Sequence, residues 1–461
     1  MSEVKIIFGP PGTGKTTRLM DILEEELSCH HPSEIAYVSF TREGANQGKN
    51  RALTRFTVYK EADFKYFRTL HSMAFQALGL KRTGVMNYKH YKFFSKKMGM
   101  RFLGYYTPDL VSGDDKYLFF DELHRNNPKA AADYLPDLNI DVLKFVRHNF
   151  RRFKDTFALL DYTDMINEFN KKNEPIPVKI AFVDEAQDLT TLQWRMVWTA
   201  FRHCDRIYIA GDDDQAIYQW SGADVEAFLQ ATGDIEILTK SYRLPDAVLE
   251  FAKNTAKHIS RRVEKDYHGT GVQGSVSFVN GIDEIDIDPN QTYMFLSRNN
   301  IFLNAIEAEL RKKRVVYARD KIPSITQKDV HTINLYEKVR ETRIASNDDM
   351  YNMLWALKEG YNFKNPWYES FNWPQDKIDY VRDLVQKKVK IRDPKIFVGT
   401  IHSVKGAEAD NVVVLLDVTR SVMLNIDKHP DTENRVFYVA FTRAKKNLIL
   451  VNSNSKYSYK L

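Results

Sequence analysis

The chain has 461 residues, of which 43% are hydrophobic and 28% charged, a composition typical of a globular protein with about two to four domains. A net charge of +6 is too small to identify a polyanionic partner by itself. Cys29 and Cys204 stand far apart, which argues against a disulfide framework, a zinc finger and a four-cysteine iron–sulfur cluster. We expect a cytoplasmic protein without a membrane partner, because no apolar run reaches the length of a membrane span and the N-terminus leaves no room for a signal peptide.

The first strong pattern is a glycine-rich turn between an apolar run, Val4–Phe8, and a helix-like segment. Strand, glycine-rich turn and helix in this order predict a nucleotide-binding P-loop. Backbone N–H groups of such a turn surround phosphates, and the helix N-terminus adds its positive end. We expect Lys15 to reach the terminal phosphates and the Thr16 hydroxyl to hold Mg²⁺. The turn reads Gly9-Pro10-Pro11-Gly12-Thr13-Gly14-Lys15-Thr16-Thr17.

Short β-type runs alternate with longer helical stretches, which predicts an α/β fold with parallel sheets. The expected strands of the first half are Val4–Phe8, Ile35–Ser39, Ile180–Val183, Ile207–Ala210 and Ile235–Leu238. Those of the second half are Tyr293–Leu296, Ile396–Thr400, Val412–Leu416 and Leu448–Val451. We therefore expect two sheets, one in each half of the chain.

Two mainly helical stretches interrupt these series of strands. Residues from about 77 to 155 are rich in Lys, Arg, Phe and Tyr and separate the P-loop part of the first series from its next strand, Ile180–Val183. Residues from about 315 to 392 interrupt the second series, with helical patterns near Val330–Ile344, Met350–Lys358 and Lys377–Lys390. Each α/β unit is thus expected to carry one insertion, and the basic, aromatic first insertion is our candidate for a strand-separating element.

An acidic sequence, Val183-Asp184-Glu185-Ala186-Gln187-Asp188, closes one of the apolar strands. A carboxylate at a strand end can coordinate Mg²⁺ through water, and a neighbouring carboxylate can polarise the attacking water. We assign Asp184 to Mg²⁺ and Glu185 to the role of general base. The alternative, a surface acidic turn, becomes less favoured once a P-loop precedes it.

A second polar segment, residues 210–220, follows the next strand and ends in aromatic residues. Gln215 is placed to sense the γ-phosphate of a bound nucleotide. Tyr218 and Trp220 are candidates for stacking on nucleic-acid bases, an interaction worth about 1–3 kcal/mol per base. The alternative for both rings is a place in the hydrophobic core.

The ordered set of motifs resembles that of the UvrD/Rep/PcrA-type helicases, the A branch of helicase superfamily 1. The matching segments are Gly9–Thr17, Ser39–Arg42, Thr69–Ser72, Asp161–Asp164, Val183–Asp188, Gly211–Trp220, Leu238–Arg243, Thr400–Glu408 and Glu433–Lys445. Ser221 departs from the pattern, because the family usually has arginine at this position. The family's glutamine motif before the P-loop, which reads adenine, has no counterpart either, so the selectivity for adenine stays open and other nucleotides are alternative substrates to ATP.

The resemblance implies two RecA-like parallel-sheet P-loop NTPase domains with mainly helical insertions. The first motor domain would comprise residues 1–76 and 156–236, with residues 77–155 as its insertion. The second would comprise residues 237–314 and 393–461, with residues 315–392 as a reduced insertion. ATP and Mg²⁺ would bind between the two motor domains.

The resemblance also implies roles for single residues. Lys15, Thr16, Asp184, Glu185 and Gln215 would act on ATP from one side, and Arg243 and Arg443 would contact the γ-phosphate from the other. Tyr242 would stack on adenine and Glu408 would contact the ribose. Single-stranded DNA would contact Phe40, Thr41, His71, Tyr218, Trp220, Arg298, Thr400 and His402.

The function that the resemblance implies is an ATP-dependent single-stranded DNA translocase and helicase. It would move 3′→5′, act at junctions of single- and double-stranded DNA, and work as a monomer. An RNA helicase or remodelling ATPase is an alternative, because no residue pattern reads a 2′-hydroxyl. A non-catalytic loading protein with the same fold is another.

Overall fold

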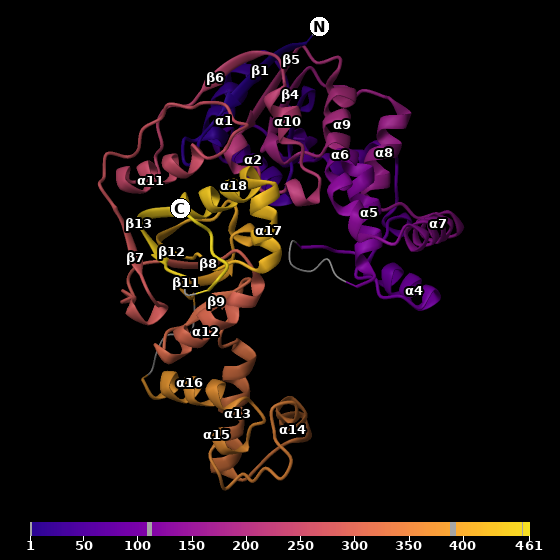
Figure 1. Cartoon of the computed structure of the whole chain (residues 1–461). Helices are drawn as coiled ribbons and strands as arrows, with labels where there is room; N and C mark the ends of the chain where they lie inside the picture. Colours follow the sequence, from indigo (N-terminus) through magenta and orange to yellow (C-terminus); the bar gives the residue numbers. More distant parts are fainter. Residues whose placement is uncertain (1, 108–112, 388–392, 454) are drawn as a thin grey trace. The chain divides into compact units, whose positions relative to one another are not determined.

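The computed structural model describes residues 2–107, 113–387, 393–453 and 455–461 (Figure 1). The chain divides into two compact units. The first unit comprises Met1–Val272 and Lys428–Val439, and the second comprises Gln273–Asp427 and Ala440–Leu461. The motor-domain boundaries given above remain a prediction.

The first unit is built on a six-stranded sheet with the order β3-β2-β4-β5-β1-β6 and only parallel pairs. The α/β prediction with parallel sheets is therefore confirmed, and all five expected strands of this half are present. The strand β3 was not expected, because its sequence Tyr-Phe-Arg-Thr is short and half polar. The strands are β1 (Glu3–Phe8), β2 (Ile35–Ser39), β3 (Tyr66–Thr69), β4 (Ile180–Asp184), β5 (Arg206–Gly211) and β6 (Asp234–Ile237).

Helices pack against the sheet of the first unit, and the carboxyl ends of its parallel strands meet at one edge. Residues after β1, β2, β4 and β5 therefore gather there, which is where open α/β sheets bind ligands. The helices of this part are α1 (Lys15–Leu27), α2 (Arg42–Arg55), α3 (Leu70–Ala77), α8 (Tyr162–Lys172), α9 (Thr191–Phe201), α10 (Val225–Leu229), α11 (Asp246–Ala256) and, continuing into the second unit, α18 (Pro430–Phe441).

The first insertion is helical, as expected, and has its own hydrophobic core. Buried aromatic rings such as Phe94, Phe119 and Phe150 form this core, and Trp220 from the segment after β5 packs against it. Figure 1 shows α4, α5 and α7 grouped together within the first unit. The helices are α4 (Tyr88–Met98), α5 (Asp115–Asn126), α6 (Pro128–Ala131) and α7 (Ile140–Thr156).

A buried ionic network fastens this insertion to α8. Arg125 on α5 contacts Asp161 at 2.9 Å and Asp164 at 3.1 Å, and Lys154 on α7 contacts Asp161 at 2.6 Å. Asp161 also caps α8, because its side chain accepts a hydrogen bond from the Asp164 amide. Asp161 and Asp164 therefore connect α5 and α7 to the start of α8, which gives the Asp161–Asp164 motif a structural role.

The second unit is built on a seven-stranded sheet with the order β10-β9-β11-β8-β12-β13-β7, in which only β9 and β10 pair antiparallel. The four expected strands are present, whereas β7, β9 and β10 were not expected because they are short or largely polar. The strands are β7 (Ser275–Val279), β8 (Tyr293–Ser297), β9 (Tyr317–Arg319), β10 (Ile322–Pro323), β11 (Ile396–Thr400), β12 (Ala409–Leu415) and β13 (Ala444–Val451).

The second insertion shares one core with the sheet that carries it. Tyr336, Trp367 and Leu384 lie in the same buried cluster as Phe295 of β8. The expected helix Lys377–Lys390 is observed as α16 ending at Gln386, and its residues 388–390 lie outside the described ranges. The helices of the second unit are α12 (Leu303–Lys312), α13 (Gln327–Thr342), α14 (Asn347–Leu354), α15 (Trp367–Ser370), α16 (Gln375–Gln386) and α17 (Arg420–Lys428).

None of the helices in the described ranges combines the length and the apolar character needed to cross a membrane.

Candidate functional site

The P-loop leaves an anion-binding helix terminus at the end of β1. Gly14 occupies the N-cap of α1 with a left-handed φ of 79°, and no side chain caps the helix or places a carboxylate in its first turn. The Lys15 ammonium donates a hydrogen bond to the Gly9 carbonyl at 2.8 Å and so spans the turn. Uncapped backbone amides beside a lysine form the arrangement that holds phosphate oxygens.

The motif around Ser241 lies directly on the P-loop. The Ser241 hydroxyl donates to the Pro11 carbonyl at 2.8 Å, and the Tyr242 amide donates to the Gly12 carbonyl at 2.8 Å. A Cβ atom at Gly12 would lie 2.4 Å from the Cβ of Arg243. Arg243 therefore stands beside the predicted phosphate site, and the Tyr242 ring next to it is 72% exposed.

Alanine at Gly12 is expected to weaken nucleotide binding more than alanine at Gly14. Both positions have a left-handed φ, 74° and 79°, so each substitution carries a backbone cost of about 1–2 kcal/mol. Only a Cβ at Gly12 would also displace Arg243, since the nearest atom at Gly14 is 3.7 Å away. Titration with a fluorescent ATP analogue, with urea unfolding of both variants, checks this. Equal losses of affinity in the two variants would contradict the close packing of Arg243.

Asp184, the last residue of β4, is buried and held by two donors. The Tyr37 hydroxyl donates to its Oδ2 atom at 2.5 Å and the Glu185 amide to its Oδ1 atom at 2.9 Å. Burial and the charge of Glu185 raise the pKa of Asp184 to about 6. A role for Tyr37 on β2 was not predicted from the sequence. Its one signal is a tyrosine in a mainly apolar strand, because a buried hydroxyl needs a hydrogen-bond partner.

The predicted base, Glu185, stands in strained backbone at the start of a hydrogen-bonded chain. Its φ is 54°, in the left-handed region that residues other than glycine rarely adopt. The Gln187 amide donates to Glu185 Oε2 at 2.6 Å and accepts from the Asp212 amide at 3.0 Å. Gln215 donates to Asp212 Oδ2 at 2.6 Å. Gln187, which the sequence did not single out, thus connects the acidic turn to the segment after β5.

Three fully buried carboxylates precede Gln215, and cations distant in sequence neutralise them. The Lys265 ammonium lies 3.4 Å from Asp212, 2.5 Å from Asp213 and 2.9 Å from Asp214. Arg262 forms a second ion pair with Asp214 at 2.7 Å. All three carboxylates are thereby occupied in holding the segment, and neither cation was predicted from the sequence.

The residues present fit Mg²⁺ held mainly by a nucleotide. No group of three or more His, Cys, Asp or Glu side chains forms a metal site among the described residues. The protein offers the Asp184 carboxylate and the Thr16 hydroxyl in the first turn of α1. Mg²⁺ is usually held by one or two protein oxygens together with phosphates and water, so this sparse set suits it.

Some of the predicted DNA-contacting residues of the first unit lie side by side. The rings of Phe40 and Tyr218 are 5.4 Å apart, and Trp220 lies 6.4 Å from Phe119 of the insertion, with the two rings nearly parallel. Burial lowers the pKa of His71 to about 4, so this imidazole is neutral at pH 7. The Thr41 hydroxyl accepts from the Gly44 amide at 3.0 Å and caps α2.

The second unit carries the other predicted residues. Arg298 and Thr400 stand at the ends of the neighbouring parallel strands β8 and β11, and the buried His402 follows, so these residues share one edge of the sheet. Arg443 is 1% exposed and precedes β13. Glu408 is exposed and lies 3.8 Å from Lys445.

Comparison with protein families gives two matches along the chain. The model of the UvrD/REP helicase N-terminal domain matches residues 2–236, which is half of the chain. The chain belongs to the UvrD/Rep helicase family. The model of the UvrD-like helicase C-terminal domain matches residues 395–451. The resemblance inferred from the motifs is therefore confirmed.

Several relatives within this family are named helicases. The chain is 24% identical to the "Probable DNA helicase" of Mycoplasma pneumoniae, over 97% of this chain and 80% of that protein. It is 25% identical to the "ATP-dependent DNA helicase PcrA" of Staphylococcus epidermidis, over 56% of this chain but only 39% of that protein. Among solved structures, an arterivirus nonstructural protein 10 (helicase) matches 98% of this chain and 60% of its own at 11% identity, with a TM-score of 0.38.

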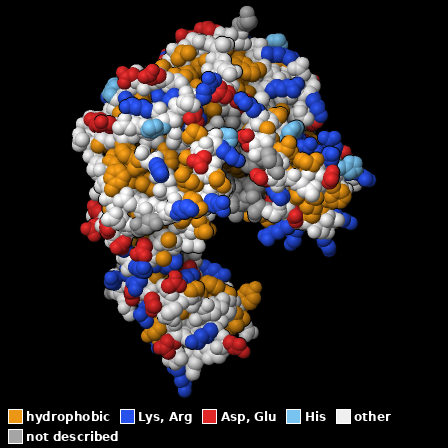
Figure 2. All heavy atoms as spheres, in the orientation of Figure 1, with side chains coloured by type: hydrophobic (Ala, Val, Ile, Leu, Met, Phe, Trp, Pro, Cys, Tyr) orange, Lys and Arg blue, Asp and Glu red, His pale blue; other side chains and the backbone are white. Residues whose placement is uncertain are grey.

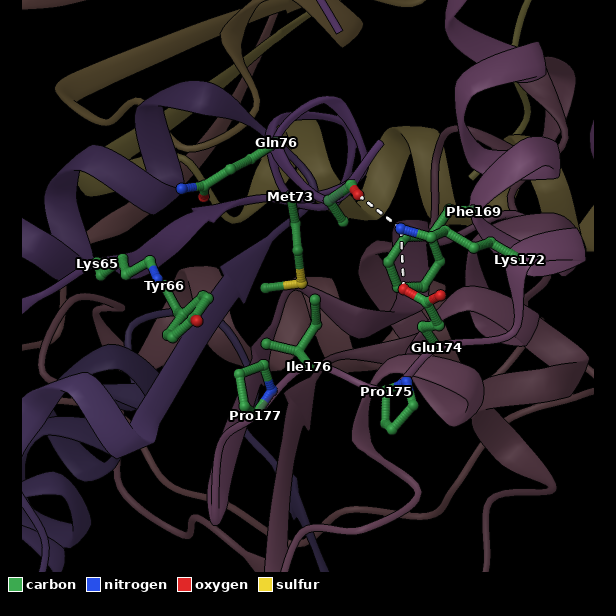
Figure 3. Close-up of a pocket in the computed structure, with 11 residues that line it drawn as sticks. Lys65, Tyr66, Met73, Gln76, Phe169, Lys172, Glu174, Pro175, Ile176 and Pro177 are labelled. Atoms are coloured by element: carbon green, nitrogen blue, oxygen red, sulfur yellow. Dashed lines mark hydrogen bonds and ion pairs between the residues drawn. The ribbon is translucent and has the colours of Figure 1, made fainter. Parts of the chain in front are cut away.

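A separate cavity of about 240 Å³ lies near the amino ends of β3 and β4 (Figure 3), whereas the predicted site residues of the first unit lie at the carboxyl ends of its strands. Met73 and Ile176 are among its apolar lining residues, and their side chains point toward one another (Figure 3). Lys172 donates to the Ala77 carbonyl at 3.2 Å and pairs with Glu174 at 2.8 Å at its rim. None of the predicted site residues lines this cavity.

Proposed function

We propose that this UvrD/Rep family chain is an ATP-dependent translocase on single-stranded DNA that unwinds duplexes, moving 3′→5′ and acting as a monomer at junctions of single- and double-stranded DNA. The observation that carries the proposal is the hydrogen-bonded chain from Glu185 through Gln187 and Asp212 to Gln215. Three residues after Gln215 comes Tyr218, whose ring contacts Phe40. One short segment thus joins the nucleotide site to aromatic groups suited to stacking on bases.

In this proposal the P-loop amides and Lys15 hold the phosphates of ATP. Thr16 and Asp184 would hold Mg²⁺, which would supply charge neutralisation on the phosphates. Glu185 takes the proton of the attacking water, and Gln215 responds to the γ-phosphate.

The remaining residues complete the nucleotide and strand sites of the proposal. Arg243 and Arg443 neutralise charge that develops in phosphoryl transfer, Tyr242 stacks on adenine, and Glu408 contacts the ribose. Arg298, Thr400 and His402 hold the DNA strand from the second unit, as Phe40, Thr41, His71, Tyr218 and Trp220 do from the first.

The surface of the first insertion supports DNA as the partner. Figure 2 shows Lys and Arg side chains gathered over the region of α4 and α7. Such a surface attracts a phosphate backbone without reading its sequence. The exposed cations of these two helices are Lys89, Lys92, Lys96, Lys97, Lys144, Arg151 and Arg152.

The test measures the rate of ATP hydrolysis without nucleic acid, with a single-stranded DNA oligonucleotide and with an RNA oligonucleotide. We expect strong stimulation by DNA, and a binding constant that falls with salt at a log–log slope of about −0.7 per phosphate contact. Stimulation by RNA only would contradict the DNA assignment. A rate of ATP hydrolysis that does not depend on nucleic acid would contradict the motor assignment. An affinity for single-stranded DNA that does not change with salt concentration would contradict binding through the phosphate backbone.

A further inference from the structure

A second cavity in the first unit opens between α5 of the insertion and the segment after β5. Its volume is about 160 Å³, which is smaller than the roughly 300–1,000 Å³ of pockets that bind larger ligands. The cavity can therefore take a ligand about as large as a single planar ring. It is lined by Gly104, Tyr105, Tyr106, Phe119, Glu122, Leu123, Trp220 and Ser221.

The walls of this cavity are aromatic. The Trp220 and Phe119 rings are inclined by only 16° at 6.4 Å between centroids, and Tyr106 meets Phe119 edge-on at 5.3 Å. The indole Nε1 of Trp220 is buried and has no hydrogen-bond partner among the described residues. Ser221 is small, and its hydroxyl is engaged with the Tyr218 carbonyl at 2.9 Å. Flat apolar walls of this kind stack nucleobases irrespective of their identity.

Glu122 places a carboxylate among the aromatic residues that line the cavity. Within the described ranges it forms neither a hydrogen bond nor an ion pair, whereas its neighbour Asp121 is paired with both Arg125 and Arg147. Burial, reinforced by the charge of Asp161, raises the pKa of Glu122 to about 7. The side chain is half-buried, and its oxygens are not among the buried atoms that lack a partner, so the carboxylate is open to the cavity that it lines. A ligand there can donate hydrogen bonds to it, because an ionised carboxylate only accepts.

We propose that the cavity receives one base of the bound strand against Trp220, and that Glu122 favours bases with an amino group on their Watson–Crick edge. This inference rests on the proposed function and adds a base preference to it. Cytosine, adenine and guanine carry an amino donor that a carboxylate accepts, as Glu and Asp accept from cytosine in base readout. Thymine presents one imino N–H between two carbonyl oxygens, which repel the carboxylate.

The test compares the affinity of the full chain for three labelled oligonucleotides of equal length. The first is all thymine, the second has cytosine at alternate positions, and the third has N4,N4-dimethylcytosine at those positions, which lacks the amino hydrogens. At pH 8 we expect the cytosine strand to bind about fivefold more tightly than the thymine strand, the lower end of base-edge discrimination. The dimethylated strand should lose this advantage.

Glu122→Gln is the decisive variant, because an amide both donates and accepts and so accommodates thymine as well as cytosine. We expect its cytosine preference to disappear. Glu168→Gln, the same change at a residue paired with Lys171 on the surface, is the matched control and should keep the preference. Urea unfolding of both variants shows whether either substitution affects folding.

The pH gives a second readout. The preference should weaken as pH falls through about 7, the pKa of Glu122, because the protonated carboxyl can donate to thymine oxygens. The surrounding groups are Asp121 and Arg125 of α5, Lys154, Asp161, Tyr91 and Tyr106. Burial raises the pKa of both tyrosines well above their usual range, so they stay neutral across this interval.

The outcomes separate this inference from the proposed function. If thymine and cytosine strands bind equally and both stimulate ATP hydrolysis, the base preference is wrong and the motor assignment stands. A fivefold preference that survives in Glu122→Gln would place the discrimination elsewhere and overturn the role of Glu122. If neither strand binds nor stimulates, the proposed function itself fails.

Discussion

Replacing Glu185 by glutamine is expected to lower the DNA-stimulated rate of ATP hydrolysis by about 10²–10⁴-fold, the contribution typical of a positioned general base. The amide cannot take the proton of the attacking water. Nucleotide binding should persist, since the P-loop and Lys15 are untouched. Steady-state turnover at saturating ATP, together with the dissociation constant of a fluorescent ATP analogue, measures the two effects separately.

Two further variants make this result specific. Glu168→Gln changes the same chemical group outside the site and should turn over ATP at the unaltered rate. Lys15→Ala should lose both nucleotide affinity and turnover, because the cation on the phosphates is gone. A Glu185→Gln protein that kept more than about a tenth of the activity would exclude Glu185 as the base. A Lys15→Ala protein that still performed its biological role would favour a non-catalytic loading protein.

Replacing Lys265 by methionine is expected to reduce the free energy of unfolding by about 3–5 kcal/mol, the cost of leaving buried charges without their partner. Lys265 is fully buried and lies within 3.4 Å of Asp212, Asp213 and Asp214. Arg262 would remain as the ion-pair partner of Asp214. Urea unfolding of the wild type and the variant at neutral pH measures the difference.

The pH dependence of that difference follows from the charges. Burial raises the pKa of Asp213 even with Lys265 present, and removing the lysine removes a charge that opposes this shift. The destabilisation from Asp213 is therefore largest above its folded-state pKa and is lost as the pH falls and the carboxylate binds a proton. Lys171→Met is the control, because Lys171 is 63% exposed in its pair with Glu168 and should cost less than about 1 kcal/mol. Equal costs for the two lysines would show that the buried carboxylates do not depend on Lys265.

The P-loop, the acidic turn and nine strands could be predicted because each is contiguous in sequence. An apolar run followed by polar residues marks a buried parallel strand and its functional end without knowledge of its neighbours. The strand β3 was not predicted, because Arg68 and Thr69 make half of its sequence polar. It is a strand because β2 offers it a parallel partner, from Ala36 to Ser39.

The partners of the site residues could not be predicted in this way. Tyr37 meets Asp184 through the pairing of β2 with β4, and Lys265 reaches the aspartates after β5 from a loop about fifty residues later. Such contacts depend on tertiary placement, which no local pattern carries. The sequence left Trp220 open between base stacking and the hydrophobic core for the same reason. Its ring is half-buried against Phe119 and also lines a cavity.

The stacking of Trp220 on Phe119 joins two parts of the chain that sequence patterns treat as separate. Phe119 is buried in the core of the insertion, whereas Trp220 belongs to the segment that follows β5. A substitution at Phe119 therefore alters the insertion core and the orientation of Trp220 at the same time. We therefore expect a replacement of Phe119 by a side chain without a flat ring to disturb both places at once, unless Trp220 changes with it.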